Sequence, residues 1–318
     1  MDRIERLTTL VVDTTLQCNM RCVYCRWGDG ATRRDSHGDA RNLVLDRALL
    51  RETGIERVVF SGGEPLLHPD LLQVIASYAS LGVASIVVIT NGLLASHEKL
   101  RAIQGAGATG VTFSLDSIAP AIAYRTRRLE VGQLARVLEH LSVAGAMRSD
   151  AWEVSVNTVL SAANVDPTTL VDLATEVQRR GAGWMKVQPV FDDGYLGASA
   201  PDLRLGARHV DSVIACGRAL SIHSLPSNPM SFWEDLAAML RGQRFAGSSC
   251  GLARRSWVLH QHGLMICPWI QAGIVGRDGV RAAIRGFAAE SSLCTPDTNC
   301  FCMQKPTHRW LQSRSDAS

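Results

Sequence analysis

The sequence has no long hydrophobic run, little net charge and no low-complexity tract. Its apolar stretches fall short of the roughly 18 to 20 residues that a membrane-spanning helix needs, and its first residues include acids, unlike the basic start of a signal peptide. Lys and Arg number 33 against 30 Asp and Glu, and the basic residues are scattered apart from a group at 125–128. These absences predict a cytoplasmic protein with neither a membrane nor a nucleic acid as partner.

The composition is that of a folded protein, but cysteine is unusually frequent. With 46% apolar residues, 318 residues can bury a core for one large domain and a small one. Nine cysteines in the reducing cytosol need a role other than disulfides. Three lie between 18 and 25, five lie between 250 and 302, and Cys216 stands apart on a predicted helix, where a buried apolar role is expected. This clustering predicts two metal centres.

Residues 1–190 alternate short β-branched runs with longer stretches of helical spacing. Six such units predict a parallel sheet with right-handed crossovers, open or curled into a barrel, with the functional site at the carboxyl ends of the strands. The predicted strands are Leu10–Val12, Arg57–Phe60, Ser85–Ile89, Gly110–Phe113, Glu153–Thr158 and Trp184–Gln188, and the predicted helices include Asp70–Leu81, Leu129–Ala144 and Thr168–Gly181.

The pattern changes twice beyond the sixth predicted strand. Residues 191–249 are rich in turns and contain two predicted helices, Gly206–Leu220 and Phe232–Arg241, so we interpret them as a bridging region. Residues 250–318 are rich in cysteine and poor in periodic segments. They are typical of a small domain that is organised by a metal rather than by its core.

Cys18, Cys22 and Cys25 directly follow the first predicted strand with the spacing Cys-x3-Cys-x2-Cys. Three thiolates are one ligand short of a closed zinc site, so they favour an iron–sulfur cluster with one iron open to another ligand, with zinc as the alternative. The spacing, with Tyr24 before the last cysteine, resembles the signature of the radical S-adenosylmethionine (SAM) superfamily. The resemblance implies a partial (β/α)6 barrel, a [4Fe-4S] cluster, SAM cleaved to a 5′-deoxyadenosyl radical, and an external electron donor of the flavodoxin or ferredoxin type.

Loops after the later strands resemble the SAM-binding loops of the same family. Gly62, Gly63 and Glu64 match its GGE motif, in which glycines allow close backbone approach and the carboxylate accepts bonds from the methionine ammonium group; an ordinary glycine-rich turn is the alternative. The resemblance further implies that Ser114 and Asp116 bind the ribose hydroxyls and that Arg127 pairs with the SAM carboxylate. It implies an adenosine or ribose contact for Asn157, and a SAM contact for Asn91 in the loop after the third strand. Common turns, helix caps or surface positions are the alternatives for these residues.

The later cysteines resemble part of a SPASM or shorter twitch domain, which carries auxiliary clusters. They are too few for two clusters and imply one auxiliary [4Fe-4S] cluster. Cys300 and Cys302 are two apart, so an extended backbone points both thiols to one side. Two ligand sets remain open: Cys267, Cys294, Cys300 and Cys302, which leaves Cys250 free, or Cys250, Cys267, Cys300 and Cys302, which leaves Cys294 free.

Three reactions can follow hydrogen abstraction by a deoxyadenosyl radical. A thiol can return hydrogen to the opposite face (an epimerase), an electron can pass to the auxiliary cluster (a dehydrogenase that makes a ketone), or a peptide can be crosslinked (a maturase). The first predicted strand begins close to Met1, which disfavours a preceding peptide-recognition domain. A barrel with one auxiliary cluster is similar to the radical SAM enzymes of aminoglycoside antibiotic biosynthesis, and most similar in layout to the neomycin-type epimerase.

The resemblance thus implies an epimerase that acts on a sugar carbon of a cationic aminoglycoside. Cys250 is the predicted catalytic hydrogen donor. Carboxylates are expected at the mouth of the barrel to bind the cationic substrate, and the candidates are Asp192, Asp193, Glu234 and Asp235.

Overall fold

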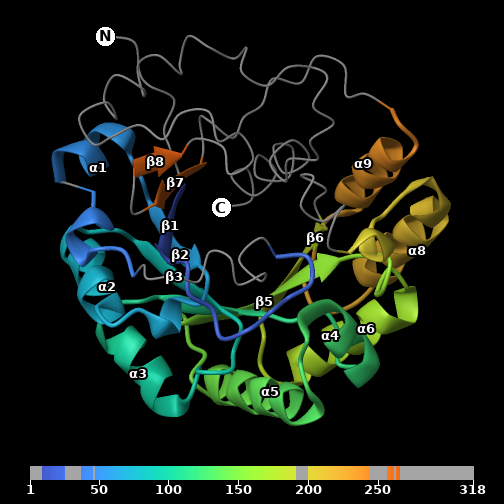
Figure 1. The fold of residues 1–318 in the computed structure, drawn as a ribbon, viewed down its shortest axis with the longest axis horizontal. Helices are drawn as coiled ribbons and strands as arrows, with labels where there is room; N and C mark the ends of the chain where they lie inside the picture. The colour runs from blue at the N-terminus through green and yellow to red at the C-terminus, as the bar shows by residue number, and fades with distance from the viewer. Residues whose placement is uncertain are drawn as a thin grey trace.

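A single curled sheet organises the part of the chain that the computed structural model describes, which is residues 9–25, 37–45, 47–190, 200–243, 256–260 and 263–265. The strand order is β6-β5-β4-β3-β2-β1-β7-β8, and all neighbours run parallel except β7 and β8. Helices cover the outer side of this sheet (Figure 1). The strands are β1 Thr9–Thr15, β2 Arg57–Gly62, β3 Ser85–Thr90, β4 Gly110–Ser114, β5 Glu153–Leu160, β6 Trp184–Pro189, β7 Ser256–His260 and β8 Gly263–Met265.

Helices α3 and α6 begin at a capping side chain. At α6 the Asp166 carboxylate accepts a bond from the Thr169 amide, and Pro167 takes the first helical position. Within the described ranges no helix is long and apolar enough to cross a membrane. The α-helices are α1 Arg47–Thr53, α2 Leu71–Ser80, α3 His97–Gly105, α4 Pro120–Arg127, α5 Val131–Ala146, α6 Pro167–Arg179, α8 Val210–Ser221 and α9 Met230–Leu240, and the 3-10 turns are η1 Ala40–Asn42, η2 Pro65–Leu67, η3 Pro201–Leu203 and η4 Ala207–His209.

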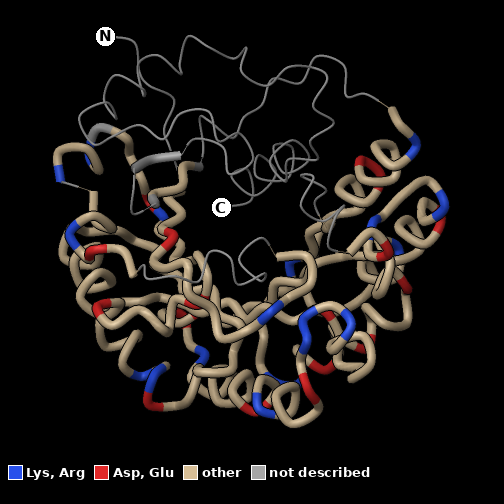
Figure 2. The backbone as a smooth tube through the Cα atoms, viewed as in Figure 1, with Lys and Arg blue, Asp and Glu red and all other residues tan. Residues whose placement is uncertain are grey.

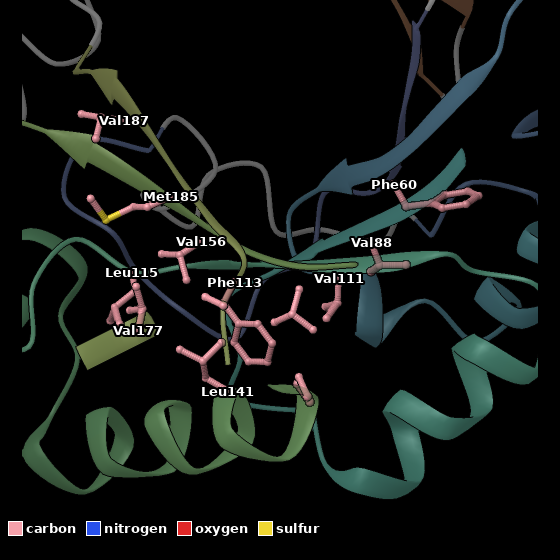
Figure 3. Packing of buried hydrophobic residues seen from close by; sticks show 14 of the residues in the cluster. Phe60, Val88, Val111, Phe113, Leu115, Leu141, Val156, Val177, Met185 and Val187 are labelled. Carbon is pink, nitrogen blue, oxygen red and sulfur yellow. The ribbon is translucent and has the colours of Figure 1, made fainter. Parts of the chain in front are cut away.

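The hydrophobic core lies between the outer face of the sheet and the helices. Strand side chains alternate between the two faces, and on β6 the buried Met185 and Val187 point outward, as Figure 3 shows. Phe113 and Val156 belong to the same core, and Phe113 lies beside Leu141 of α5 (Figure 3). Burying a side chain of this size contributes about 1.5–3 kcal/mol. The alternate positions, which include Lys186, therefore face the inside of the curl, while charges of both signs are interspersed on the outer helices (Figure 2).

The sheet contains a seventh parallel strand, which corrects the predicted six-stranded barrel. Thr9–Val12 of β1 pair in register with residues 256–259 of β7, and β8 returns antiparallel as a short hairpin. The sequence pattern could not reveal this pairing, because β7 is only five residues long and is separated from β1 by most of the chain. The boundaries 1–190, 191–249 and 250–318 stay a prediction, although the last segment supplies a strand to the barrel sheet.

The two helices predicted in the bridging region are present. One begins as the turn η4 and continues as α8, and the other is α9. Helix α8 packs against both α6 and α9. Cys216 of α8 is fully buried in the core, as its helical position predicts.

Candidate functional site

The predicted site residues follow the carboxyl ends of β1 to β5, which meet at one edge of the sheet. The segment 16–25, here called the cysteine loop, leaves β1 and passes beside α4 (Figure 1). The Val23 amide donates to the Thr126 carbonyl oxygen at 2.9 Å, which ties the loop to that helix. Parallel strands thus bring motifs that are far apart in the sequence to one place.

Cys18, Cys22 and Cys25 are partly buried on the cysteine loop. Burial raises the pKa of the Cys22 thiol to about 12 and is also the main cause that raises the pKa of Cys18. Neighbouring cysteines raise both pKa values further, because several thiolates close together repel one another. Cationic iron would neutralise these charges.

A four-iron cluster fits this donor set better than a single metal ion does. No three His, Cys, Asp or Glu side chains of the described residues form a group that could hold one ion. In a [4Fe-4S] cluster each thiolate binds a different iron, so the three thiols need not converge on one point. The donor set therefore favours a cluster, which Cys18, Cys22 and Cys25 would hold, over the alternative zinc site.

Two glycines let the second strand approach the cysteine loop closely. The Gly63 amide donates to Thr15 and the Glu64 amide donates to Gln17, at 2.6 and 2.8 Å from their carbonyl oxygens. A Cβ atom on Gly63 would stand 2.0 Å from the Gln17 carbonyl oxygen, and Gly62 has a φ of +119°. The GGE segment is therefore more than an ordinary glycine-rich turn, since larger residues would push the cysteine loop away.

Glu64 connects the loops after β2 and β3. Its carboxylate is fully buried and accepts from the Thr90 hydroxyl at 2.7 Å, from the Leu66 amide at 3.1 Å and from the Asn91 amide at 2.8 Å. Burial raises the pKa of Glu64, and these bonds oppose that shift. In this arrangement Glu64 orders two loops, and its predicted bond to the methionine ammonium group stays a prediction.

Tyr24, Asp116 and Arg127 form a buried polar cluster, here called the anchor. The Tyr24 hydroxyl donates to Asp116 Oδ2 at 2.5 Å, and Arg127 Nη1 donates to Tyr24 at 2.9 Å and to Asp116 Oδ1 at 3.3 Å. Asp116 Oδ1 also accepts from the Val159 amide, and the Asn164 side chain holds the Asp116 carbonyl. The anchor therefore connects the cysteine loop to the ends of β4, α4 and β5.

The hydrogen bonds within the anchor bear on the SAM contacts predicted for Asp116 and Arg127. Asp116 is fully buried and each of its oxygens already has a donor, so its predicted ribose contact stays a prediction. Arg127 is only 6% exposed, which excludes a solvent-facing helix residue. Its Nε atom is buried without a partner among the described residues, and a SAM carboxylate would supply an acceptor for it. By contrast, Arg125 is exposed and pairs with Asp202.

A polar row crosses the inner face of the sheet. Ser114, Asn157 and Lys186 are register partners on β4, β5 and β6. Asn157 Oδ1 is buried with no partner in the described structure, which fits its predicted contact with an adenosine or ribose hydroxyl. Desolvation, and next the Arg57 cation, lower the pKa of Lys186 to about 8.

The sequence predicted no role for two residues of the site. Lys186 could have been found, because it interrupts the buried positions Met185 and Val187 on a strand. Asn164 carries no such signal, since its bonds to the Asp116 and Val159 carbonyl oxygens depend on how the loop folds.

Several predicted residues lie outside the described ranges. They are the catalytic candidate Cys250, the candidate auxiliary ligands Cys267, Cys294, Cys300 and Cys302, and two of the carboxylates expected at the mouth, Asp192 and Asp193. Glu234 and Asp235 lie on α9. The auxiliary cluster and its ligand set stay predictions.

Comparison with known proteins agrees with this geometry. The sequence model of the radical SAM superfamily matches residues 12–160. Among curated relatives, GTP 3′,8-cyclase from Chlorobaculum tepidum is 31% identical over 196 residues, which cover 60% of this chain and 57% of the relative. GTP 3′,8-cyclase from Peptoclostridium acidaminophilum is 33% identical over 160 residues, 49% of this chain and 47% of the relative. The chain thus spans about half the length of these relatives.

Solved structures show the same fold at low identity. Streptococcus suis SuiB bound to the precursor peptide SuiA has a TM-score of 0.64 at 11% identity, covering 86% of this chain and 62% of that one. Native anSMEcpe with bound AdoMet has a TM-score of 0.60 at 15% identity, covering 83% and 75%. Radical SAM proteins use a [4Fe-4S] cluster and SAM, the cofactors that the cysteine loop and its neighbouring loops fit. Residues 12–160 therefore match the radical SAM superfamily, and the rest of the described fold is similar to that of these solved structures.

Proposed function

We propose that this protein is a radical SAM enzyme that takes a hydrogen atom from a small molecule held against the inner face of the sheet. The observation that carries the proposal is the cysteine loop, fixed by buried contacts to β2 through Gly63 and to α4 through the anchor. Such preorganisation fits a site that must hold a cluster and a second ligand in a fixed relation.

In this proposal, residues of the chain would hold the cluster and orient SAM. Cys18, Cys22 and Cys25 would hold the cluster, and SAM would bind beside it. When bound, the cluster supplies one electron to the sulfonium of SAM, which yields methionine and a 5′-deoxyadenosyl radical. Arg127 Nε and Asn157 Oδ1, both buried and without partners in the described structure, are the groups of the chain best placed to orient SAM.

The test is SAM cleavage by anaerobically reconstituted protein. With SAM and a low-potential reductant, the wild type should produce 5′-deoxyadenosine, while Cys22→Ala should produce none and bind less iron. Cys216→Ala is the matched control, because this thiol is buried in the core on α8, and it should leave cleavage unchanged. A wild-type protein that is loaded with iron but cleaves no SAM would refute the proposal.

For the substrate we retain the aminoglycoside epimerase that the layout of the sequence suggests, with Cys250 as hydrogen donor. Its support is the resemblance of a barrel followed by a cysteine-rich segment. In deuterated water the wild type should incorporate deuterium at one inverted sugar carbon. Cys250→Ala should lose this product while 5′-deoxyadenosine still forms. A ketone without solvent deuterium would instead support the dehydrogenase.

An anionic substrate such as a nucleotide is the second candidate, and Lys186 favours it. This ammonium group lies on the inner face of the sheet, partly desolvated and near Arg57, so an anion would relieve its unfavourable surroundings, whereas a polycation would add repulsion. The GTP 3′,8-cyclases among the relatives point to the same class of substrate.

The two candidates separate in one panel of substrates. Wild type and Lys186→Met are incubated with SAM, reductant and either GTP or aminoglycosides, and products are followed by mass spectrometry. A nucleotide enzyme should consume GTP with a KM that rises in Lys186→Met and recovers in Lys186→Arg. Turnover of aminoglycosides alone, unaffected by Lys186→Met, would reject the nucleotide.

A further inference from the structure

The Asn91 side chain contacts a cluster-binding thiol. After β3, its amide nitrogen Nδ2 donates to Cys18 Sγ at 3.8 Å and to Asn19 Oδ1 at 2.7 Å. Its oxygen Oδ1 accepts from the Leu93 amide at 3.0 Å. Asn91 is only 6% exposed, and both hydrogens of its amide group have acceptors within the protein. The residue therefore has no free donor with which to bind SAM.

The donors on Cys18 are consistent with a thiolate that carries charge. The Met20 amide also approaches Cys18 Sγ, at 3.4 Å, so that one sulfur has two N–H donors from two different loops. Hydrogen bonds to cysteine sulfurs are among the features that set the reduction potential of iron–sulfur clusters. They stabilise the reduced cluster more than the oxidised one, because reduction adds negative charge to the cluster and its thiolates.

Asn91 is itself held firmly in place. Its backbone amide donates to Glu64 Oε2 at 2.8 Å, and Glu64 is fully buried between the loops after β2 and β3. A side chain fixed in this way keeps its donor pointed at the thiol without losing further conformational entropy.

We propose that Asn91 is a positioning residue that raises the reduction potential of the SAM-binding cluster through its hydrogen bond to Cys18. This inference rests on the proposed function. It replaces the SAM contact expected for Asn91 from sequence with an action through the cluster ligand. Its consequence is that the physiological electron donor can reduce the cluster more readily.

The test measures the reduction potential of the reconstituted cluster without SAM, by redox titration followed by EPR. The signal that changes when SAM is added to a parallel sample identifies the cluster held by the cysteine loop. Asn91→Ala removes the donor, and Asn91→Asp keeps the acceptor for the Leu93 amide but replaces the donor with an acceptor oxygen that carries negative charge. The cluster of both variants should have a lower reduction potential than that of the wild type, and the potential should be lowest in Asn91→Asp. Iron content should stay close to that of the wild type.

The control is Asn19→Ala, which removes the other acceptor of the same amide and leaves the contact with Cys18. It should keep the wild-type potential. An equal drop in Asn19→Ala would overturn the inference, because Asn91 would then act by holding the loop. Wild-type potentials in both Asn91 variants would also overturn it, as would failure of both to load iron. If the wild type assembles no cluster, both the proposed function and this inference are refuted. If the wild type cleaves SAM but the Asn91 and Asn19 variants give one of these contrary results, only the inference is refuted.

Discussion

Replacing Asp116 by Asn should strongly destabilise the protein, although the two side chains have nearly the same shape. The substitution removes the negative charge that faces the Arg127 guanidinium, 3.3 Å away and only 6% exposed. Leaving one charge of a buried pair uncompensated costs about 3–5 kcal/mol. A domain of about 150–250 residues loses about 2–4 °C of Tm per kcal/mol, so Tm should fall by about 6 to 20 °C.

The assay is denaturant and thermal unfolding of the cluster-free protein, so that iron loading does not enter the comparison. Asp202→Asn is the matched control, because the Arg125–Asp202 pair is shorter, at 2.8 Å, but exposed, and should contribute less than about 1 kcal/mol. Arg127→Met combined with Asp116→Asn should cost less than the sum of the two single changes. The reasoning fails if Asp116→Asn costs no more than Asp202→Asn, or if the double variant is simply additive.

Three further changes test other parts of the structure. Gly63→Ala should abolish iron loading while the far-ultraviolet circular dichroism spectrum keeps its helical signal, because its Cβ would stand 2.0 Å from the Gln17 carbonyl oxygen; normal loading would show that the cysteine loop can move aside. The pKa of Lys186, about 8, lies below the ordinary value, so an anion that binds Lys186 should lose affinity as pH rises from 7 to 9 and Lys186 loses its charge. Calorimetry on the wild type and on Lys186→Met checks this. The loss should be greater in the wild type, because any contribution of Arg57 and the nearby Glu153 carboxylate is present in both proteins. Glu176→Gln should lower the free energy of unfolding by about 1 kcal/mol at pH 7, a screened surface contribution. Hydrogen bonds from arginines lower the pKa of Glu176 to about 2, so the difference in urea unfolding should be complete above pH 4.5 and disappear as pH falls toward 2.

The sequence was sufficient for most of the barrel because its strands are buried on their outer face. The six predicted strands lie within β1 to β6, and the predicted Asp70–Leu81 differs from α2 by one residue at each end. No bounds were predicted for helices α1, α3 and α4; α4 has only eight residues, and buried polar side chains interrupt its apolar pattern. Strand β7 was missed because its partner β1 is remote in sequence.

For the site, motifs could be predicted but contacts could not. The spacing of the cysteines and the two glycines is local, and local spacing is visible in a sequence. The bonds of Asp116 to Tyr24 and Arg127 depend on the ends of a loop, a strand and a helix meeting in space, and nothing in the order of these residues reveals it.

The cysteine loop is held in place mainly by polar contacts rather than by apolar packing. Met20 is the buried hydrophobic residue of this segment, so packing alone provides little to hold the loop. Hydrogen bonds provide the rest, from Gly63 on one side and from the anchor on the other. Directional contacts suit a loop that must present three thiols in fixed positions, because apolar packing tolerates small displacements whereas a short hydrogen bond does not. The same polarity places buried charges beside the cluster site, so the stability of this region and the electrostatics that the cluster experiences have a common structural origin.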